Sequence, residues 1–260
     1  MDAQLSYIAY SNSKQDVRGI VYNFGRGDKD QLDLAPVHSR AEFNSICVAS
    51  TGLADVAVIT KNAETAGCIG LFLYPDLTVF TDLRRNDTQY GSANFQRGDP
   101  STTPPIPAVK GNTNRKTVQQ LIEEGLLPGI PILSISRDQA EELFDTMENA
   151  KLISMSTSMY TRIVETQIPV CYFYGKISPD KYVLIGSQRD SFAYGISDAL
   201  SGTIAQMEVV NVIGEMKANG WENKRTLLFA SWGATEYGLI GSYEWVQQYR
   251  KKLQSMYVLF

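Results

Sequence analysis

The chain has 260 residues, 43% of them hydrophobic and 20% charged, with a formal net charge of −4 and a pI near 5.2. This composition is typical of a folded protein, and the length suffices for one large domain or two ordinary ones. The acidic balance argues against nucleic acid or an anionic membrane surface as a partner, because both favour a basic surface. No apolar run approaches the roughly 20 residues that span a bilayer, and residues 1–16 show no secretory signal.

Two residue types limit the chemistry that the chain offers. His38 is the only histidine, so this chain alone cannot carry out a mechanism that needs two histidines, and the polar surroundings of His38 predict a surface side chain. The cysteines Cys47, Cys68 and Cys171 form no CxxC pair and cannot all pair with one another. Their number therefore leaves the redox compartment open.

The first half of the chain predicts strands, a helix and one long loop. Residues 17–25 are a β-rich run closed by glycine, and residues 67–75 are a nearly continuous apolar run, typical of a strand buried on both faces. Between them, residues 60–67 space their alanines as a short helix that ends at a glycine. Residues 76–116 are polar and rich in proline, and we expect an ordered excursion that packs on another part of the protein.

A strand and a helix complete this half. Residues 130–136 read IPILSIS and predict a strand. Ser136 then stands as an N-cap with Gln139 three residues later, the signature of a capping box before a helix that ends at Met147. We expect a first domain over residues 1–150.

The second half alternates strands and helices joined by short links. The expected elements are β runs within 161–177, a strand at 182–186, a helix at 201–216, a strand at 225–232, a helix at 236–253 and the start of another strand at 257–260. Apolar residues recur at helical spacing from Ile204 to Ile213, and Gly220 follows where a left-handed cap is usual. The alternation predicts a parallel sheet with right-handed crossovers.

Acid and amide side chains gather where two of these strands end. Gln188 and Asp190 follow the strand at 182–186, Asp198 lies in the loop beyond, and Thr235 and Glu236 follow the strand at 225–232. Ligands of open α/β sheets collect at the carboxyl ends of the strands, so the pattern predicts a site. A structural alternative is equally open, in which Asp198 caps a helix and Glu236 occupies a first helical turn.

Long stretches of the chain resemble one family. The runs KYVLIGSQRDSFAYGISDALSG (181–202) and GWENKRTLLFASWGATEYGLIGSYEW (220–245) resemble the glutamate carboxypeptidase II and transferrin receptor family of di-zinc exopeptidase-like proteins. The runs KNAETAGCIGLFLYPD (61–76), FQRGDPSTTPPIPA (95–108) and GIPILSISRDQAEELF (129–144) resemble its protease-associated (PA) domain. The resemblance implies an α/β fold, with a β-rich PA unit followed by the first part of a zinc-exopeptidase-like sheet that carries helices on its faces.

This likeness implies a PA domain at residues 1–150, a partial peptidase-like domain at 151–260, and a role for each clustered residue in the latter. Asp198 matches the aspartate that bridges two zinc ions, and Glu236 matches a further zinc ligand. Gln188 stands where active members have a histidine ligand, and Asp190 matches the aspartate that orients that histidine. Thr235 occupies the position of the general base, and threonine does not take the proton from a metal-bound water. The transferrin receptor branch is similar in carrying QRD, with no peptidase activity implied.

A second metal site is also implied by the resemblance. Thr103 and Glu244 match two positions of a structural calcium site, whereas Ile106 and Gln247 stand at its other positions. The alternative for Glu244 is a solvated carboxylate on a helix face. Asn86 begins the glycosylation sequon Asn-Asp-Thr, which has meaning in a secretory-pathway protein.

We therefore expect a non-catalytic, receptor-like or scaffold protein, seen as a partial chain, with a remnant zinc site. Its partner would be another protein or a second copy, through family-type assembly in a longer chain. The family implies a cell-surface or secretory-pathway membrane, with these domains extracellular or luminal. The alternative is a zinc-dependent metallo-exopeptidase that releases C-terminal residues, completed in a longer chain. A third alternative is an incomplete product with no independent function, because an unpaired strand edge is prone to association.

Overall fold

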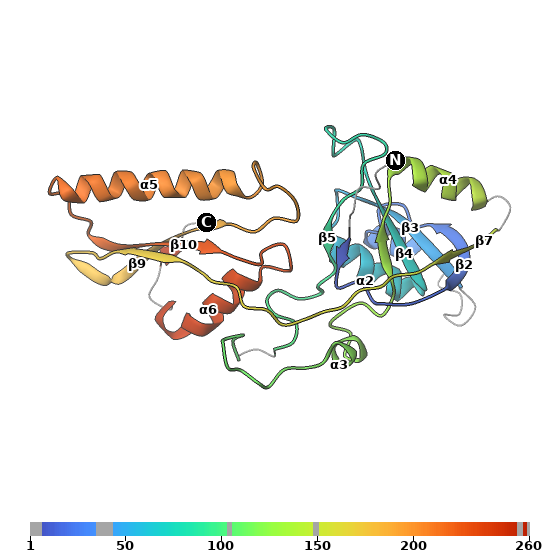
Figure 1. Cartoon of the computed structure of the whole chain (residues 1–260), viewed down its shortest axis with the longest axis horizontal. Helices are drawn as coiled ribbons and strands as arrows, with labels where there is room; N and C mark the ends of the chain where they lie inside the picture. Colours follow the sequence, from blue (N-terminus) through green and yellow to red (C-terminus); the bar gives the residue numbers. More distant parts are fainter. Residues whose placement is uncertain (1–6, 35–43, 103–105, 148–150, 254–256, 259–260) are drawn as a thin grey trace. The chain divides into compact units, whose positions relative to one another are not determined.

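A computed structural model describes residues 7–34, 44–102, 106–147, 151–253 and 257–258 (Figure 1). The chain divides into two compact units, Met1–Gln96 with Lys116–Arg162, and Arg97–Arg115 with Ile163–Phe260. The domain boundary expected at residue 150 stays a prediction, and His38 and Thr103 lie outside the described residues. None of the described helices combines the length and apolar character that a bilayer crossing requires.

The first unit is built on a five-stranded sheet with the order β6-β4-β3-β2-β7. Its strands are β2 (Val17–Asn23), β3 (Ser45–Thr51), β4 (Gly70–Pro75), β6 (Ile132–Ser134) and β7 (Leu152–Met155), and β1 (Ile8–Ala9) pairs separately with β5 (Gly91–Ser92). Its helices are α1 (Lys29–Leu34), α2 (Val56–Ala66), α3 (Val118–Glu123) and α4 (Arg137–Met147). The central strands are parallel, and only β7 runs antiparallel to its neighbour.

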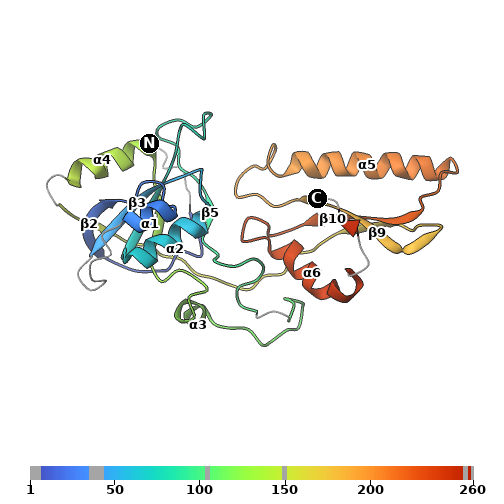
Figure 2. The same cartoon turned by 180° about the vertical axis from the view of Figure 1, so that it is seen from behind.

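Each face of this sheet carries its own core. Successive strand residues point to opposite faces, so Cys47 joins one cluster and Val48 the other. Helix α2 covers the first face with residues such as Ile59, and α4 covers the second with Ala140 (Figure 2). An apolar run such as β4 is therefore buried along its whole length, as the sequence predicts.

The predicted helix ends are confirmed, except that one helix begins earlier than predicted. Gln139 N donates to Ser136 Oγ (3.2 Å) and Ser136 N donates to Gln139 Oε1 (2.9 Å), which confirms the capping box before α4. Helix α2 begins at Val56, earlier than the predicted residue 60, because Asp55 caps it by accepting from Ala57 N. It ends at Gly67 with φ +93°, as expected for a glycine cap.

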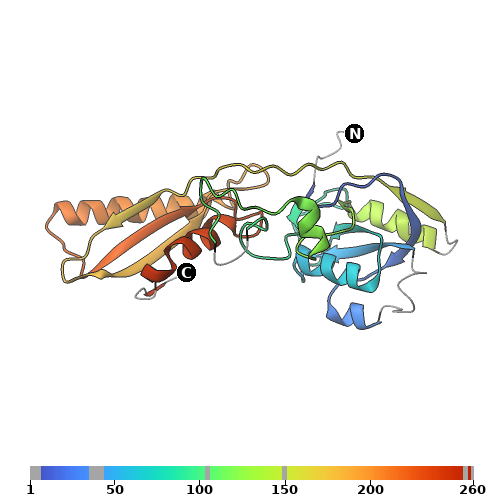
Figure 3. The same cartoon turned by 90° about the horizontal axis from the view of Figure 1, so that it is seen from below.

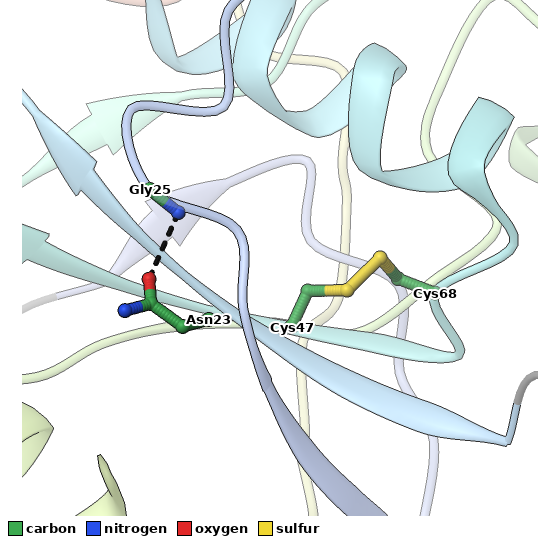
Figure 4. Close-up of a disulfide and its surroundings, with 4 residues drawn as sticks. All are labelled: Asn23, Gly25, Cys47 and Cys68. Atoms are coloured by element: carbon green, nitrogen blue, oxygen red, sulfur yellow. Dashed lines mark hydrogen bonds between the residues drawn. A yellow bond between two sulfur atoms is a disulfide. The ribbon is translucent and has the colours of Figure 1, made fainter. Parts of the chain in front are cut away.

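A disulfide joins Cys47 of β3 to Cys68, two residues before β4 (Figure 4). Both cysteines are buried in the core beneath α2, and their Cα atoms lie 5.8 Å apart. Beside the bridge, Asn23 Oδ1 accepts from Gly25 N at 2.9 Å and shapes the turn after β2. Cys171 is the free cysteine. The sequence left this pairing open, and the structure settles it.

The second unit is a smaller α/β layer structure with the strand order β11-β9-β10-β8. Its elements are β8 (Val170–Phe173), β9 (Ser178–Gln188), α5 (Leu200–Ala218), β10 (Arg225–Trp232), α6 (Ile240–Leu253) and β11 (Tyr257–Val258). Strands β9, β10 and β11 are parallel, β8 is antiparallel to β10, and α5 and α6 lie on opposite faces (Figure 3). The β runs expected within 161–177 reduce to β8, because residues 161–169 lie mostly exposed without a partner strand.

The two helices differ in how they pack. Trp245 of α6 is buried and contacts Trp232 and Tyr249, with ring centroids 5.6 Å and 5.0 Å away, so this helix packs on the sheet through aromatic side chains. Helix α5 has the predicted helical spacing and ends before Gly220 at φ +90°. Its apolar side chains are not buried by the described residues, and Met207 is 60% exposed.

Candidate functional site

The site lies where β9 and β10 end side by side. Gln188, the last residue of β9, pairs with Trp232, the last residue of β10, and Arg189 N donates to Trp232 O at 2.9 Å. The chain leaving each strand therefore starts at the same sheet edge. The loop after β9 carries Asp190, and the loop after β10 carries Glu236, so parallel pairing brings these acids together.

Asp190 holds the loop that follows β10. Its Oδ1 accepts from Thr235 N at 2.8 Å, and its Oδ2 accepts from Glu236 N at 3.0 Å. Ala234, just before these amides, has φ +57°, a left-handed conformation that is uncommon for residues other than glycine. A charged acceptor on two successive amides stabilises such a loop. The side chain that the resemblance assigns to orienting a histidine thus orients backbone here.

Gln188 links the two loops through its side-chain amide. Gln188 Nε2 donates to Glu236 Oε1 and to Asp190 O, each at 3.0 Å. An amide nitrogen carries two protons and both are used by these bonds. The glutamine therefore turns its donor group, not its oxygen, toward the glutamate.

Glu236 is the titratable group that the environment affects most at this edge. Burial raises the pKa of the Glu236 carboxyl, and the charges of Asp198 and Asp190 raise it further, while the hydrogen bond from Gln188 lowers it. Asp198 itself is exposed. These three acids are close enough for their charges to interact, as the strand ends predict.

Both structural alternatives for these acids are wrong. The N-cap of α5 is Ala199, with no side-chain cap, so Asp198 does not cap that helix. Helix α6 begins at Ile240, so Glu236 lies in the preceding turn and not in a first helical turn. Backbone bonds from Gly238 N and Leu239 N to Thr235 O close that turn and delay the helix.

Thr235 places a hydroxyl at the position that the resemblance assigns to a general base. Within the described part of the chain, Thr235 Oγ1 is buried and has no hydrogen-bond partner. A hydroxyl has no basic lone pair of the strength that removes a proton from water near neutral pH. The Thr235 hydroxyl therefore supplies no general base at this edge of the sheet.

A catalytic zinc site needs three protein ligands, drawn from imidazole, thiolate and carboxylate, with an open water position. Among the described residues no three histidine, cysteine, aspartate or glutamate side chains come together in such a group. Asp190 is engaged with two backbone amides, and Gln188 presents N–H groups. The donors that remain are Asp198 and Glu236, so the described residues do not fit a catalytic zinc centre.

Glu244 of α6 is buried, and its interpretation as a solvated helix-face carboxylate is wrong. Its Oε1 accepts from Asp99 N at 2.8 Å and its Oε2 accepts from Ala108 N at 2.7 Å. The segment Arg97–Arg115 therefore folds onto α6 within the second unit. With Thr103 outside the described residues, the calcium site of Thr103 and Glu244 stays a prediction.

Three residues of this segment, Gly98, Asp99 and Arg115, were not predicted from the sequence to be important. Arg115 pairs with Asp99 through Nη1 and Oδ2 and donates to Ser101 Oγ at 2.7 Å, and the Arg115 and Asp99 side chains are 14% and 19% exposed. Gly98 has φ +85°, and a Cβ there would overlap Glu244 Oε1. The sequence signal was weak, a Gly-Asp-Pro turn inside a proline-rich run.

Replacing Glu244 with glutamine should release this segment. Glutamine presents an N–H toward one of the two backbone donors, and an unpaired buried donor costs about 1–3 kcal/mol. We expect faster tryptic cleavage at Lys110 and Arg115 and a lower unfolding midpoint. Gln248→Ala, at an exposed position of the same helix, is the matched control. Unchanged cleavage in Glu244→Gln would show that the carboxylate does not anchor the segment.

Comparison with solved structures defines the fold class. The chain matches a zinc aminopeptidase from Bacillus subtilis with a TM-score of 0.58 at 19% identity, covering 97% of this chain and 50% of that one. It matches a peptidase M28 precursor from Shewanella amazonensis SB2B with a TM-score of 0.58 at 17% identity, covering 96% of this chain and 52% of that one. The chain thus has the mixed α/β fold of these peptidase structures, and the predicted fold class is confirmed.

Sequence comparisons find one family that part of the chain resembles. Residues 172–260 match the sequence model of peptidase family M28. The "Probable glutamate carboxypeptidase LAMP1" of Arabidopsis thaliana is 30% identical over 224 residues, which are 78% of this chain and 33% of that protein. The second half of the chain is thus similar to peptidase family M28, and the chain spans about a third of the length of its glutamate carboxypeptidase-like relative.

Proposed function

We propose that this chain is a non-catalytic, receptor-like or scaffold member of the glutamate carboxypeptidase II and transferrin receptor group within the M28-related peptidases. The observation that carries the proposal is the bond from Gln188 Nε2 to Glu236 Oε1. It fills, with an amide and a carboxylate, the place where a catalytic member needs an imidazole and a metal. The carboxylate that would bind the cation instead accepts a hydrogen bond.

Loss of the base supports the same function independently. Hydrolysis of a peptide needs an activated water, and general-base catalysis contributes about 10²–10⁴-fold to such a step. Thr235 offers no base, and its hydroxyl is buried without a partner in the described structure. Restoring a metal alone would therefore leave the reaction slow.

The function of such a protein is binding, through a protein partner or a second copy within a longer chain. We further propose that the first unit is a PA domain, and that the protein resides at a cell-surface or secretory-pathway membrane with these units outside or in the lumen. Two features support this assignment. They are the strand and helix order of the first unit and the resemblance of residues 61–76 and 129–144 to PA domains.

A zinc metallo-exopeptidase is the second candidate. One observation favours it, namely that Asp198 and Asp190 raise the pKa of Glu236, which places acids close together at the strand ends. The name of the Arabidopsis relative is in line with this activity for that protein. In this function the missing ligands would come from residues beyond those matched here.

Zinc content and peptidase activity separate the two candidates. We expect the full chain to hold much less than one zinc per molecule after dialysis against trace zinc, and to release no C-terminal glutamate from short acidic peptides. Gln188→His combined with Thr235→Glu should raise zinc affinity by about tenfold or more, since single changes around metal ligands shift affinity on that scale. Gln248→His is the matched control, because it adds a histidine on the exposed side of α6.

One outcome would favour the enzyme. Wild-type protein that holds near one equivalent of zinc, and loses it in Asp198→Ala, has a working site despite its glutamine. Hydrolysis by that protein, abolished by the same substitution, would overturn the non-catalytic proposal.

A further inference from the structure

We propose that Asn86 carries an N-linked glycan, and that the chain folds in an oxidising compartment where Cys47 and Cys68 become joined. The inference concerns the first unit and does not depend on whether the site in the second unit is catalytic. It rests on three observations, namely the conformation around Asn86, a buried hydroxyl that the fold does not use, and the disulfide.

The sequon lies in a turn that presents its asparagine to solvent. Asn86-Asp87-Thr88 is the sole Asn-X-Ser/Thr triplet of the sequence, with X other than proline. Asp87 N donates to Arg84 O at 3.0 Å, and Asp87 Oδ2 accepts from Arg84 N at 2.8 Å. On the other side, Arg85 Nε donates to Asp138 Oδ1 at 2.7 Å. The residues on both sides of Asn86 are thus held, while Asn86 is exposed.

Thr88 is poorly explained by the fold alone. Its Oγ1 is buried and, among the described residues, has no hydrogen-bond partner. An unpaired buried hydroxyl costs free energy that valine, of the same shape, would avoid. Glycan transfer gives a reason for a hydroxyl at residue 88, because the acceptor triplet requires serine or threonine at its third position. Transfer to the chain before folding is compatible with its later burial.

The disulfide supplies independent support for the compartment. Disulfides form and persist in oxidising environments such as the lumen of the secretory pathway, which is also where asparagine-linked glycans are added. Cys47 and Cys68 are 0% and 4% exposed in the core. A bridge buried in this way is formed during folding, so the chain must fold where an oxidant is present.

Both covalent steps use reactants that the secretory pathway supplies, a lipid-linked oligosaccharide and an oxidised dithiol protein. In the first, Asn86 Nδ2 forms a bond to C1 of the sugar of a lipid-pyrophosphate-linked oligosaccharide, the C1–O bond to pyrophosphate breaks, and the amide nitrogen gives up one proton. In the second, two thiols lose two protons and two electrons to the disulfide of an oxidised dithiol protein. Neither step uses a residue of the candidate site.

Mass spectrometry of the protein from the cells that make it tests the proposal. Treatment with peptide N-glycosidase before trypsin converts glycosylated asparagine to aspartate, and the peptide of residues 86–97 is then read. We expect Asn86 to appear as aspartate, whereas Asn94 in the same peptide stays asparagine. Alkylation under denaturing, non-reducing conditions should label Cys171 alone, and reduction should expose Cys47 and Cys68.

Sequon variants of the full chain, secreted from eukaryotic cells, give the matched comparison. Thr88→Ser should keep the glycan, Thr88→Ala and Asn86→Gln should lose it, and Asn114→Gln, an exposed asparagine outside any sequon, should keep it. Unmodified Asn86 in native protein whose Cys47–Cys68 bridge is intact would overturn the glycan. Three alkylated cysteines without reduction would overturn the oxidising compartment.

Discussion

Replacing Asp190 with alanine is expected to lower the free energy of unfolding of the second unit by about 2–3 kcal/mol. The substitution removes a charged acceptor from two successive amides, those of Thr235 and Glu236. Hydrogen bonds to charged groups contribute about 1.5–3 kcal/mol, and an amide left unpaired adds a desolvation cost. The loop after β10 would lose the contact that holds Ala234 in its left-handed conformation.

Tryptophan fluorescence in a urea titration measures this effect. The three tryptophans, Trp221, Trp232 and Trp245, all belong to the second unit, so their signal follows its unfolding. Asp180→Ala is the control, because the Asp180 side chain is 73% exposed and makes a long ion pair with Lys181. Surface pairs of that kind contribute about 0–1 kcal/mol. Equal losses in the two variants would show that Asp190 does not hold the loop.

The expected result also bears on function. The resemblance implies that the matching aspartate of catalytic members orients a histidine ligand, so that its removal there would weaken metal binding. Here the loss should appear without added zinc and should be the same in the presence of a chelator. A loss that depends on zinc would instead point to a metal site that includes this edge of the sheet.

The placement of the site was predictable because it follows from strand order. The apolar runs that become β9 and β10 are recognisable in the sequence, and parallel neighbours end at the same edge. Gln188 and Glu236 therefore had to lie close to each other. Their hydrogen bond, and the engagement of Asp190 with backbone, were not predictable, because both depend on the left-handed residue Ala234, which no local propensity indicates.

The burial of Glu244 and the pairing of Cys47 with Cys68 could not be predicted from the sequence either, because both depend on contacts between distant residues. Glu244 contacts Asp99 and Ala108, which are 145 and 136 residues away in sequence, so no periodicity of α6 signals its burial. Cys47 and Cys68 meet only after α2 returns the chain to the strand beside β3. Local sequence patterns specify helices and strands, whereas contacts between residues this far apart in the sequence form only when the helices and strands pack together.

Removing the disulfide should have the largest effect on the first unit. Cys47 and Cys68 close a loop with a sequence separation of 21 residues, and a bridge over a loop of that size restricts the unfolded chain by about 3 kcal/mol. The double variant Cys47→Ala, Cys68→Ala keeps small apolar groups in the core, so we expect a loss of about 3 kcal/mol with little added cost from polarity. Cys171→Ala, outside the bridge, is the control.

Hydrogen exchange of β3 and β4 reports this loss directly, because the bridge joins the core beneath these strands and their amides exchange when the first unit opens. When the exchange rate follows the equilibrium population of the open state, a loss of about 3 kcal/mol makes exchange faster by about two orders of magnitude. The tryptophan signal should shift less, since the bridge lies wholly within the first unit. Wild-type protein treated with a reductant should match the double variant, and exchange that stays slow after complete reduction would show that packing of α2 on the sheet suffices without the covalent link.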